Sequence, residues 1–235
     1  MNKHYAYDGP FKMKDNKDNE YTLTVEYDEC AEDPREWDNL CTMVCWHRNY
    51  RIGDKHNYDD VDEFFRYVLH HICGMAYEDF DALDTDGNYK LICESSKLLI
   101  KPINLYDHSG ITVSTSNVYP YNDYWDAGCV GFIYVTKQKI FDECGGITEE
   151  NWKEKADEYL ESEMDTYDQY LRGEVYWFRF TKKVIHQDLC PHCGEVIREY
   201  EDEDEIDSCG GFYGDCLEDN GILDNLPSGI KFIED

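Results

Sequence analysis

The stretch at residues 147–181, ITEENWKEKADEYLESEMDTYDQYLRGEVYWFRFT, decides the fold class because it joins a long helix directly to a strand. Thr148 is a good helix N-cap, and the two glutamates after it suit the positive end of a helix. Gly173 ends the helix, because glycine readily takes the left-handed conformation that follows a last helical turn. Residues 174–181 then alternate in polarity and predict a strand. The helix is expected to bury one stripe of side chains: Trp152, Ala156, Tyr159, Leu160, Tyr167, Tyr170 and Leu171.

Strands outnumber helices in the rest of the chain. Alternating or short apolar runs predict strands at residues 21–27, 41–46, 98–105, 111–116 and 129–136, and helical spacing predicts a second helix at residues 61–72. Because helices and strands do not alternate, the pattern predicts an α+β fold with a mostly antiparallel sheet, two main helices and a hairpin at Cys190 and Cys193. Residues 1–19 are polar and predict a loose N-terminal arm, and residues 20–235 are expected to form a single α+β domain.

Charge is the outlying property of the composition. Fifty-two acidic side chains face 22 basic ones, which gives a formal net charge of −30, while 41% hydrophobic residues suffice for a packed core. A body this acidic repels polyanions such as DNA, RNA and anionic membrane surfaces. We therefore expect a basic protein as the partner, with no direct contact to nucleic acid or to a membrane.

The location is predicted from apolar runs and cysteines. Apolar runs in the chain stay far below the roughly 20 residues that a spanning helix needs, and the N-terminus carries no apolar signal-like region. The 11 cysteines are an odd number, and several lie in apolar strings where free thiols behave as small hydrophobes. These features predict a soluble protein in a reducing cytoplasm.

The most specific local motif is Cys190-Pro-His-Cys-Gly194. Two cysteines separated by two residues and followed by glycine form a tight turn that aims both thiolates at one point, as in half of a zinc ribbon. A structural zinc ion needs two more ligands, and the candidates are Cys209 and Cys216. Two free thiols in an exposed turn, or a redox-active pair, are the alternatives.

The acidic run at residues 201–205 is a second candidate site. It consists of Glu201, Asp202, Glu203, Asp204 and Glu205. Such a run is usually a solvated loop or edge. Carboxylates at a phosphate-like spacing, however, can occupy the nucleic-acid-binding cleft of another protein, so we also interpret this run as a partner-binding surface.

The loop at residues 106–110, YDHSG, is a third candidate. Asp107 and His108 supply a carboxylate and an imidazole, the groups that a metal-dependent hydrolase or nuclease would use. Neighbouring residues of a strand point to opposite faces, so the two side chains share a target only if the chain turns there.

Several segments together resemble a known family. They are residues 36–40 (EWDNL), 43–47 (MVCWH), 105–112 (LYDHSGIT), 125–128 (WDAG), 130–135 (VGFIYV) and 207–214 (DSCGGFYG). This set is similar to an uncharacterised family of proteins encoded by phages and other mobile elements, with the likeness spanning roughly residues 21–215. That family has no assigned activity, so the resemblance implies no catalytic residue. The family usually has tryptophan at the position of Gly210.

Charge and resemblance together predict the function. We expect a phage-encoded anti-defence protein of the anti-CRISPR or anti-restriction type, which mimics nucleic acid and binds a basic host protein in the host cytoplasm. One alternative is a metal-dependent hydrolase or nuclease that uses His108 and Asp107. Another is a nucleotide-binding sponge, which would need a local basic pocket.

Overall fold

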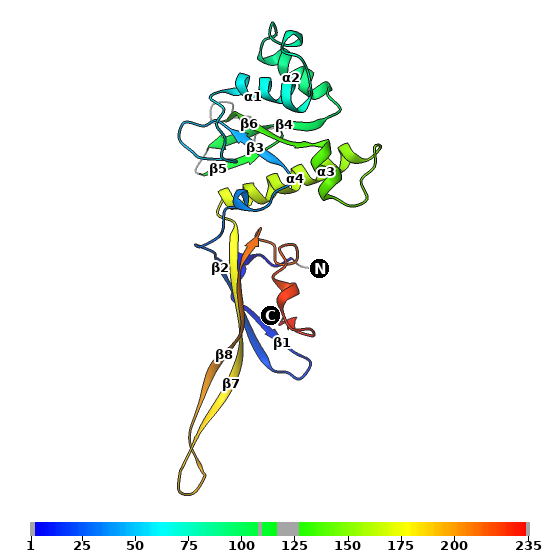
Figure 1. Cartoon of the computed structure of the whole chain (residues 1–235). Coiled ribbons are helices and arrows are strands. Elements are labelled where there is room, and N and C mark those ends of the chain that lie inside the picture. The colour runs from blue at the N-terminus through cyan, green and yellow to red at the C-terminus, as the bar shows by residue number, and fades with distance from the viewer. Residues whose placement is uncertain (1–2, 108–109, 117–126, 234–235) are drawn as a thin grey trace. The chain divides into compact units, whose positions relative to one another are not determined.

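The computed structural model describes residues 3–107, 110–116 and 127–233. The chain forms two compact units: residues 1–32 with 173–235 make up unit 1, and residues 33–172 make up unit 2 (Figure 1). This division differs from the single domain predicted over residues 20–235. Unit 2 is inserted between β2 (Glu20–Tyr27) and β7 (Val175–Leu189), two strands of unit 1 that pair with each other. Periodicity predicts strands but not which distant strands pair.

A four-stranded sheet forms the centre of unit 2. Its strands are β3 (Thr42–Cys45), β4 (Leu98–Asp107), β5 (Ile111–Ser114) and β6 (Ala127–Thr136). They lie in the order β3-β6-β4-β5, and each neighbouring pair is antiparallel. These strands confirm the mostly antiparallel α+β fold.

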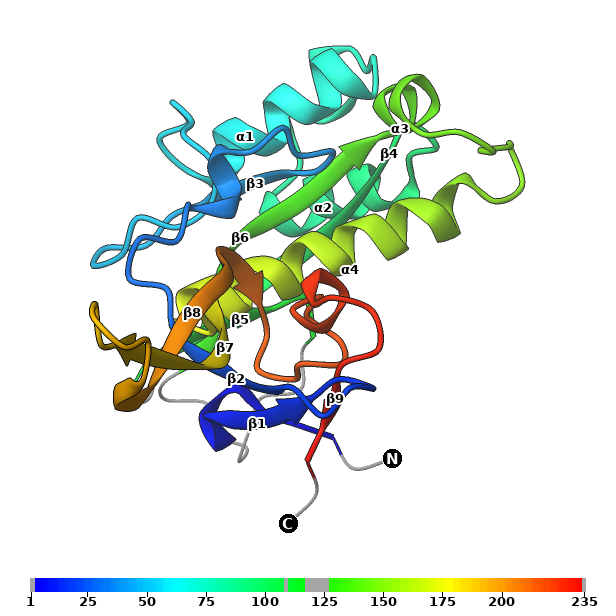
Figure 2. The same cartoon turned by 90° about the horizontal axis from the view of Figure 1, so that it is seen from below.

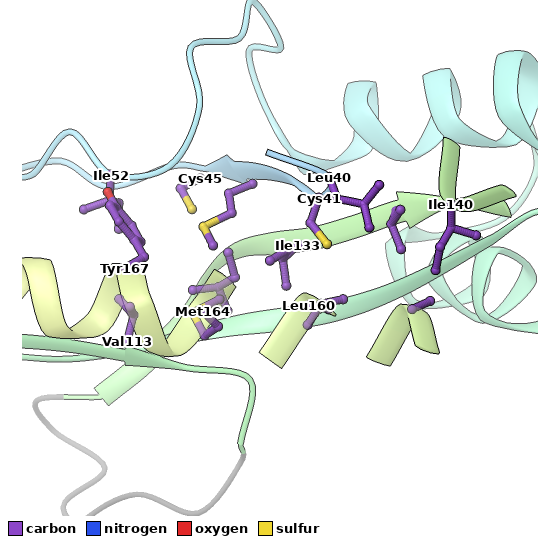
Figure 3. Close-up of a cluster of buried hydrophobic side chains, with 14 of the residues drawn as sticks. Leu40, Cys41, Cys45, Ile52, Val113, Ile133, Ile140, Leu160, Met164 and Tyr167 are labelled. Atoms are coloured by element: carbon purple, nitrogen blue, oxygen red, sulfur yellow. The ribbon is translucent and has the colours of Figure 1, made fainter. Parts of the chain in front are cut away.

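Helices cover both faces of this sheet. The side chains of Ile133 and Val135 pack toward α3 (Lys137–Glu143) and α4 (Trp152–Leu171), forming the core in Figure 3. The alternate residues Phe132 and Tyr134 pack toward α1 (Val61–Tyr67) and α2 (Thr85–Glu94). Viewed from below, α4 runs along the sheet in front of β4 and β6 (Figure 2). The described part of the chain thus has four α-helices, two more than the main helices predicted.

The helix predicted after Thr148 forms, but its N-cap is Asn151 and not Thr148. It begins at Trp152, and the Thr148 hydroxyl accepts a hydrogen bond from the Asn151 N–H (3.3 Å) in the turn before it. Gly173 has φ +74° directly after the last turn, as expected of a helix-ending glycine. Tyr159 is 42% exposed, so the prediction that it belongs to the buried stripe is wrong.

Unit 1 is built on a five-stranded sheet of order β8-β7-β2-β1-β9. Besides β2 and β7 it contains β1 (Phe11–Lys14), β8 (Val196–Tyr213) and β9 (Lys231–Phe232). Its buried face packs against the N-terminal and C-terminal segments of the chain through Ala6, Leu217 and Ile222. The loose arm predicted over residues 1–19 therefore contains a strand of the sheet. The helices of the described residues include none with the length and apolar character to cross a membrane.

Candidate functional site

The β7–β8 hairpin extends far beyond the rest of its sheet (Figure 1). The two strands pair from Val175 and Tyr213 to Leu189 and Val196, whereas β2 follows β7 only as far as Lys182. Residues 183–203, which we call the distal hairpin, therefore form a two-stranded ribbon, and no other described strand pairs with it. Every residue from Val196 to Gly211 is exposed. The sequence predicted a hairpin at Cys190 and Cys193, and its two strands extend over residues 175–189 and 196–213.

The predicted partner-binding acids lie in strand β8 and not in a loop. Successive residues of a strand point to opposite faces. Glu201, Glu203 and Glu205 therefore lie on one face of the ribbon, and Asp202 and Asp204 lie on the other. The five residues predicted as one surface are thus divided between two surfaces.

Four glutamates form a straight row on one face. Residues 199, 201, 203 and 205 stand opposite Gln187, Ile185, Lys183 and Thr181 in a stretch without register shifts. We call Glu199, Glu201, Glu203 and Glu205 the glutamate column. Two residues of a strand span about 6.8 Å, so the carboxylates repeat at roughly the spacing of neighbouring phosphates along a nucleic acid strand. Of the four opposite residues only Lys183 is basic, so most of the negative charge of the column is not neutralised across the strands.

Cross-strand hydrogen bonds hold the glutamate column in place. The Gln187 amide donates to Glu199 Oε2 (2.7 Å), and the Thr181 hydroxyl donates to Glu203 Oε2 (2.9 Å). Lys183 Nζ lies 3.0 Å from Glu201 Oε1, and this hydrogen bond raises the pKa of the lysine. These contacts reduce the freedom of the carboxylates while leaving them in water.

The opposite face of the distal hairpin is mixed in character. Asp202 stands opposite Val184, and Asp188 stands opposite Arg198. His186 and Tyr200 stack with ring centroids 5.4 Å apart, and the Arg198 guanidinium lies 5.1 Å from the centroid of the tyrosine ring. Acids, bases and aromatic rings alternate there, so the glutamate column is the more uniformly acidic face.

The structure does not bring together the four cysteines predicted as zinc ligands. Cys190 and Cys193 lie in the turn at the tip of the hairpin, whereas Cys209 stands opposite Phe178 in the body of the sheet. Phe178 precedes Leu189 by eleven residues, which corresponds to about 36 Å of extended strand. Cys216 lies elsewhere, in a β-bridge with Tyr5. The cysteines are separated because the acidic run continues strand β8 instead of folding back as a loop.

The turn at the tip is nevertheless ordered by its own hydrogen bonds. The Gly194 N–H donates to the Cys190 carbonyl (2.9 Å), and the Cys190 N–H donates to the Glu195 carbonyl (2.7 Å). The backbone N–H groups of His192 and Cys193 also donate to the Cys190 sulfur, which lowers the pKa of that thiol. Across residues 3–107, 110–116 and 127–233, no cluster of three or more potential ligands is arranged for a metal ion.

Of the predicted pair Asp107 and His108, the structure describes Asp107. Asp107 is the last residue of β4, and its Oδ2 accepts a hydrogen bond from the Tyr50 hydroxyl (2.9 Å). His108 lies outside the described residues. The side chain of Asp107 thus has a hydrogen-bond partner in unit 2, and its pairing with His108 stays a prediction.

Unit 2 also contains a hollow that the sequence did not predict. It encloses about 500 Å³ between α1, α2 and β6, with apolar and aromatic walls and a rim of aspartates. The residues that define its character are Trp46, Phe65, Tyr89, Phe132, Asp59, Asp60 and Asp86. No Lys or Arg is among the described residues that line it, so the hollow does not suit the phosphates of a nucleotide.

Comparison of the chain with protein-family models, with curated proteins and with solved structures gives no match. The likeness to phage and mobile-element proteins therefore stays a prediction.

Proposed function

We propose that this protein binds a basic, nucleic-acid-binding protein through the glutamate column and so keeps nucleic acid out of the partner's binding cleft. The observation that carries the proposal is the row of four carboxylates, one every second residue, on an exposed and regular strand. A strand fixes the interval between side chains, which a flexible acidic loop cannot do. A cleft that binds consecutive phosphates with lysine and arginine would meet a matching series of anions.

The electrostatics of the whole chain support this interaction. A formal net charge of −30 attracts a basic partner over long range and raises the rate of association at low salt. The narrow shape of a two-stranded ribbon lets it enter a groove that a whole globular unit could not enter. The exposed side chains of Ile185 and Ile197 would add apolar contacts beside the charged ones.

The resemblance to phage proteins suggests the biological setting. In that setting the partner is a host defence nuclease of the CRISPR or restriction type, and the protein acts as an inhibitor in the host cytoplasm. This setting rests on the resemblance alone, whereas binding to a basic cleft rests on the hairpin.

The two alternatives have less support. A nuclease that uses Asp107 and His108 would need its polyanionic substrate to approach a strongly acidic body, which is unfavourable without bridging metal ions. A nucleotide sponge would need basic residues around a pocket, and the hollow of unit 2 has carboxylates at its rim instead.

The test compares two variants with the same change of charge. Glu201→Gln/Glu203→Gln/Glu205→Gln removes three members of the glutamate column. Glu143→Gln/Glu150→Gln/Glu154→Gln removes three exposed carboxylates of unit 2. Each is added to a panel of restriction endonucleases and CRISPR effector nucleases, and cleavage of plasmid DNA is measured at several salt concentrations.

We expect the parent to inhibit at least one nuclease in a salt-sensitive manner. The hairpin variant should lose inhibition by about tenfold or more, which corresponds to about 1.4 kcal/mol, while the unit 2 variant stays within about twofold of the parent. Equal losses in both variants would show that net charge acts without the glutamate column. Inhibition of none of the nucleases in the panel would overturn the proposal.

A further inference from the structure

The tip of the distal hairpin presents two thiols side by side. Cys190 and Cys193 are hydrogen-bonded to each other, and the Cys190 sulfur also accepts the backbone N–H groups of His192 and Cys193. Gly194 follows with φ +74°, the left-handed conformation that closes the turn. The backbone thus directs two sulfur atoms to one point before any ligand is bound. This geometry is what a metal needs from half of its ligand set.

The other half of such a set is missing from the same chain. A structural zinc ion is held tetrahedrally by four protein ligands, most often cysteines and histidines. Cys209 is separated from the tip by the length of the ribbon, and the described residues bring no third ligand to the two thiols. The tip is also the end of an exposed ribbon, where Cys193 is exposed and Cys190 is half-buried.

We propose that Cys190 and Cys193 form half of a tetrahedral zinc site and that the same two residues of a second copy of this chain complete it. Two identical pairs of thiolates satisfy the four positions if the metal lies on a two-fold axis. Such an axis is the commonest symmetry of protein dimers. Two copies would then be joined tip to tip through their distal hairpins.

The side chains around the tip favour this contact between identical copies. Leu189, Val196 and Ile197 flank the turn, and they are 56%, 49% and 66% exposed. A two-fold contact at the tip would bring the two sets of apolar side chains together and remove part of their surface from water.

Charge does not prevent the two tips from meeting. Residues 186–198 carry two acidic side chains, Asp188 and Glu195, and one basic one, Arg198, whereas residues 199–205 carry six acidic side chains and no basic one. The nearest member of the glutamate column on the paired strands, Glu199, stands opposite Gln187, and the remaining members lie progressively farther from the tip. The repulsion between the two copies is therefore concentrated away from the metal.

The test is a metal titration of the full-length protein, reduced with a phosphine and freed of metal. Co(II) is added in steps, and the thiolate-to-metal charge-transfer absorption is followed together with the molar mass in solution. We expect the absorption to reach its plateau at one metal per two chains, with the mass changing from monomer to dimer over the same range. Zn(II) should displace Co(II) and keep the dimer, and a chelator should restore the monomer.

Cysteine variants separate the tip from the other thiols. Cys190→Ser and Cys193→Ser should each abolish the dimer and the plateau. Cys30→Ser, which removes an exposed thiol elsewhere in unit 1, should change neither. A circular dichroism spectrum like that of the parent would show that the variants are folded.

Three results would overturn the proposal. A plateau at one metal per chain with a monomeric mass would mean that the site is completed within the chain. If the reduced protein binds no metal, or if the dimer persists without metal, the ion does not join the two copies. None of these results bears on the glutamate column, because the cysteine variants keep all four carboxylates and the glutamine variants keep both thiols.

Discussion

Arg35 and Glu163 form an ion pair inside unit 2, with Arg35 Nη1 2.9 Å from Glu163 Oε2 and the arginine side chain only 3% exposed. The same guanidinium binds both carboxylate oxygens of Asp54 and the Cys41 carbonyl. Glu163 also accepts the backbone N–H groups of Leu40 and Cys41. This network holds residues 35–41, which precede β3, against the middle of α4.

Replacing Arg35 should therefore destabilise unit 2 strongly. Arg35→Met keeps the length and the apolar stem of the side chain but leaves Asp54 and Glu163 without their cation. Breaking a buried pair from one side costs about 3–5 kcal/mol, because the remaining charges stay poorly solvated. Urea unfolding followed by tryptophan fluorescence measures the loss, since four of the five tryptophans lie in unit 2.

Lys55→Met is the matched control. Lys55 pairs with Glu36 at 3.4 Å, but its side chain is 97% exposed. An exposed pair contributes at most about 1 kcal/mol, so this variant should unfold close to the parent. Similar losses in the two variants would contradict the structural role assigned to the Arg35 network.

The close packing of β3 against β6 depends on Gly131. A Cβ atom there would lie 2.2 Å from the Val44 carbonyl oxygen and 2.7 Å from the Cys45 Cα. Both are backbone atoms, so the strands would have to separate. Gly131→Ala should cost about 1–3 kcal/mol or more. Gly128→Ala on the same strand, where a Cβ meets nothing within 4 Å, should cost little, and comparing the two by urea unfolding checks the register.

Local patterns predicted the elements of the fold but not their pairing. The helix before Gly173 and the strand around Leu23 were predictable because each has one buried face, which gives the sequence a clear period. The strands around Ile103 and Ile133 are covered by helices on both faces, and they were predictable as short apolar runs. The pairing of β2 with β7 joins segments separated by all of unit 2. No local signal specifies such a pair, and this is why the sequence suggested one domain.

The extent of strand β8 in the candidate site could not be predicted from the sequence. The distal hairpin is exposed on both faces, so its strands lack the alternation of apolar and polar residues that marks a half-buried strand. The acids at residues 201–205 therefore appeared to be a loop, and Cys209 appeared free to approach Cys190. Ladder hydrogen bonds and cross-strand partners such as Thr181 and Gln187 hold this strand instead.

The distal hairpin should be dispensable for the stability of unit 1. Residues 185–201 can be replaced by Asn-Gly, a two-residue turn suited to joining the paired residues Val184 and Asp202. Because the removed residues are exposed, apart from the half-buried Cys190, the free energy of unfolding should change by less than about 1 kcal/mol. Leu23→Ala, a fully buried core position, should cost about 2–5 kcal/mol. A large loss in the shortened protein, measured by hydrogen exchange in β2, would show that the hairpin supports the core.

Asp15 organises the turn between β1 and β2. Its Oδ1 accepts the backbone N–H groups of Lys17 (2.8 Å) and Asn19 (3.0 Å), and its Oδ2 accepts the Asn19 amide (2.7 Å) and the Tyr21 hydroxyl (3.2 Å). Hydrogen bonds from the Asn19 side chain, then from the backbone and Tyr21, lower the pKa of Asp15 to about 2. Each of these donors favours the charged form of the carboxyl group.

This lowered pKa predicts how unit 1 responds to acid. An unfolded aspartate has a pKa of about 3.9, so Asp15 stabilises the folded state above about pH 4 and loses that contribution as the pH falls toward 2. The difference in urea midpoint between the parent and Asp15→Asn should therefore be largest above pH 4 and shrink toward pH 2. Asn19→Ala removes the largest cause, so an NMR titration should show the pKa of Asp15 rising toward its ordinary value. A parent protein in which Asp15 titrates near pH 4 would contradict the geometry of this turn.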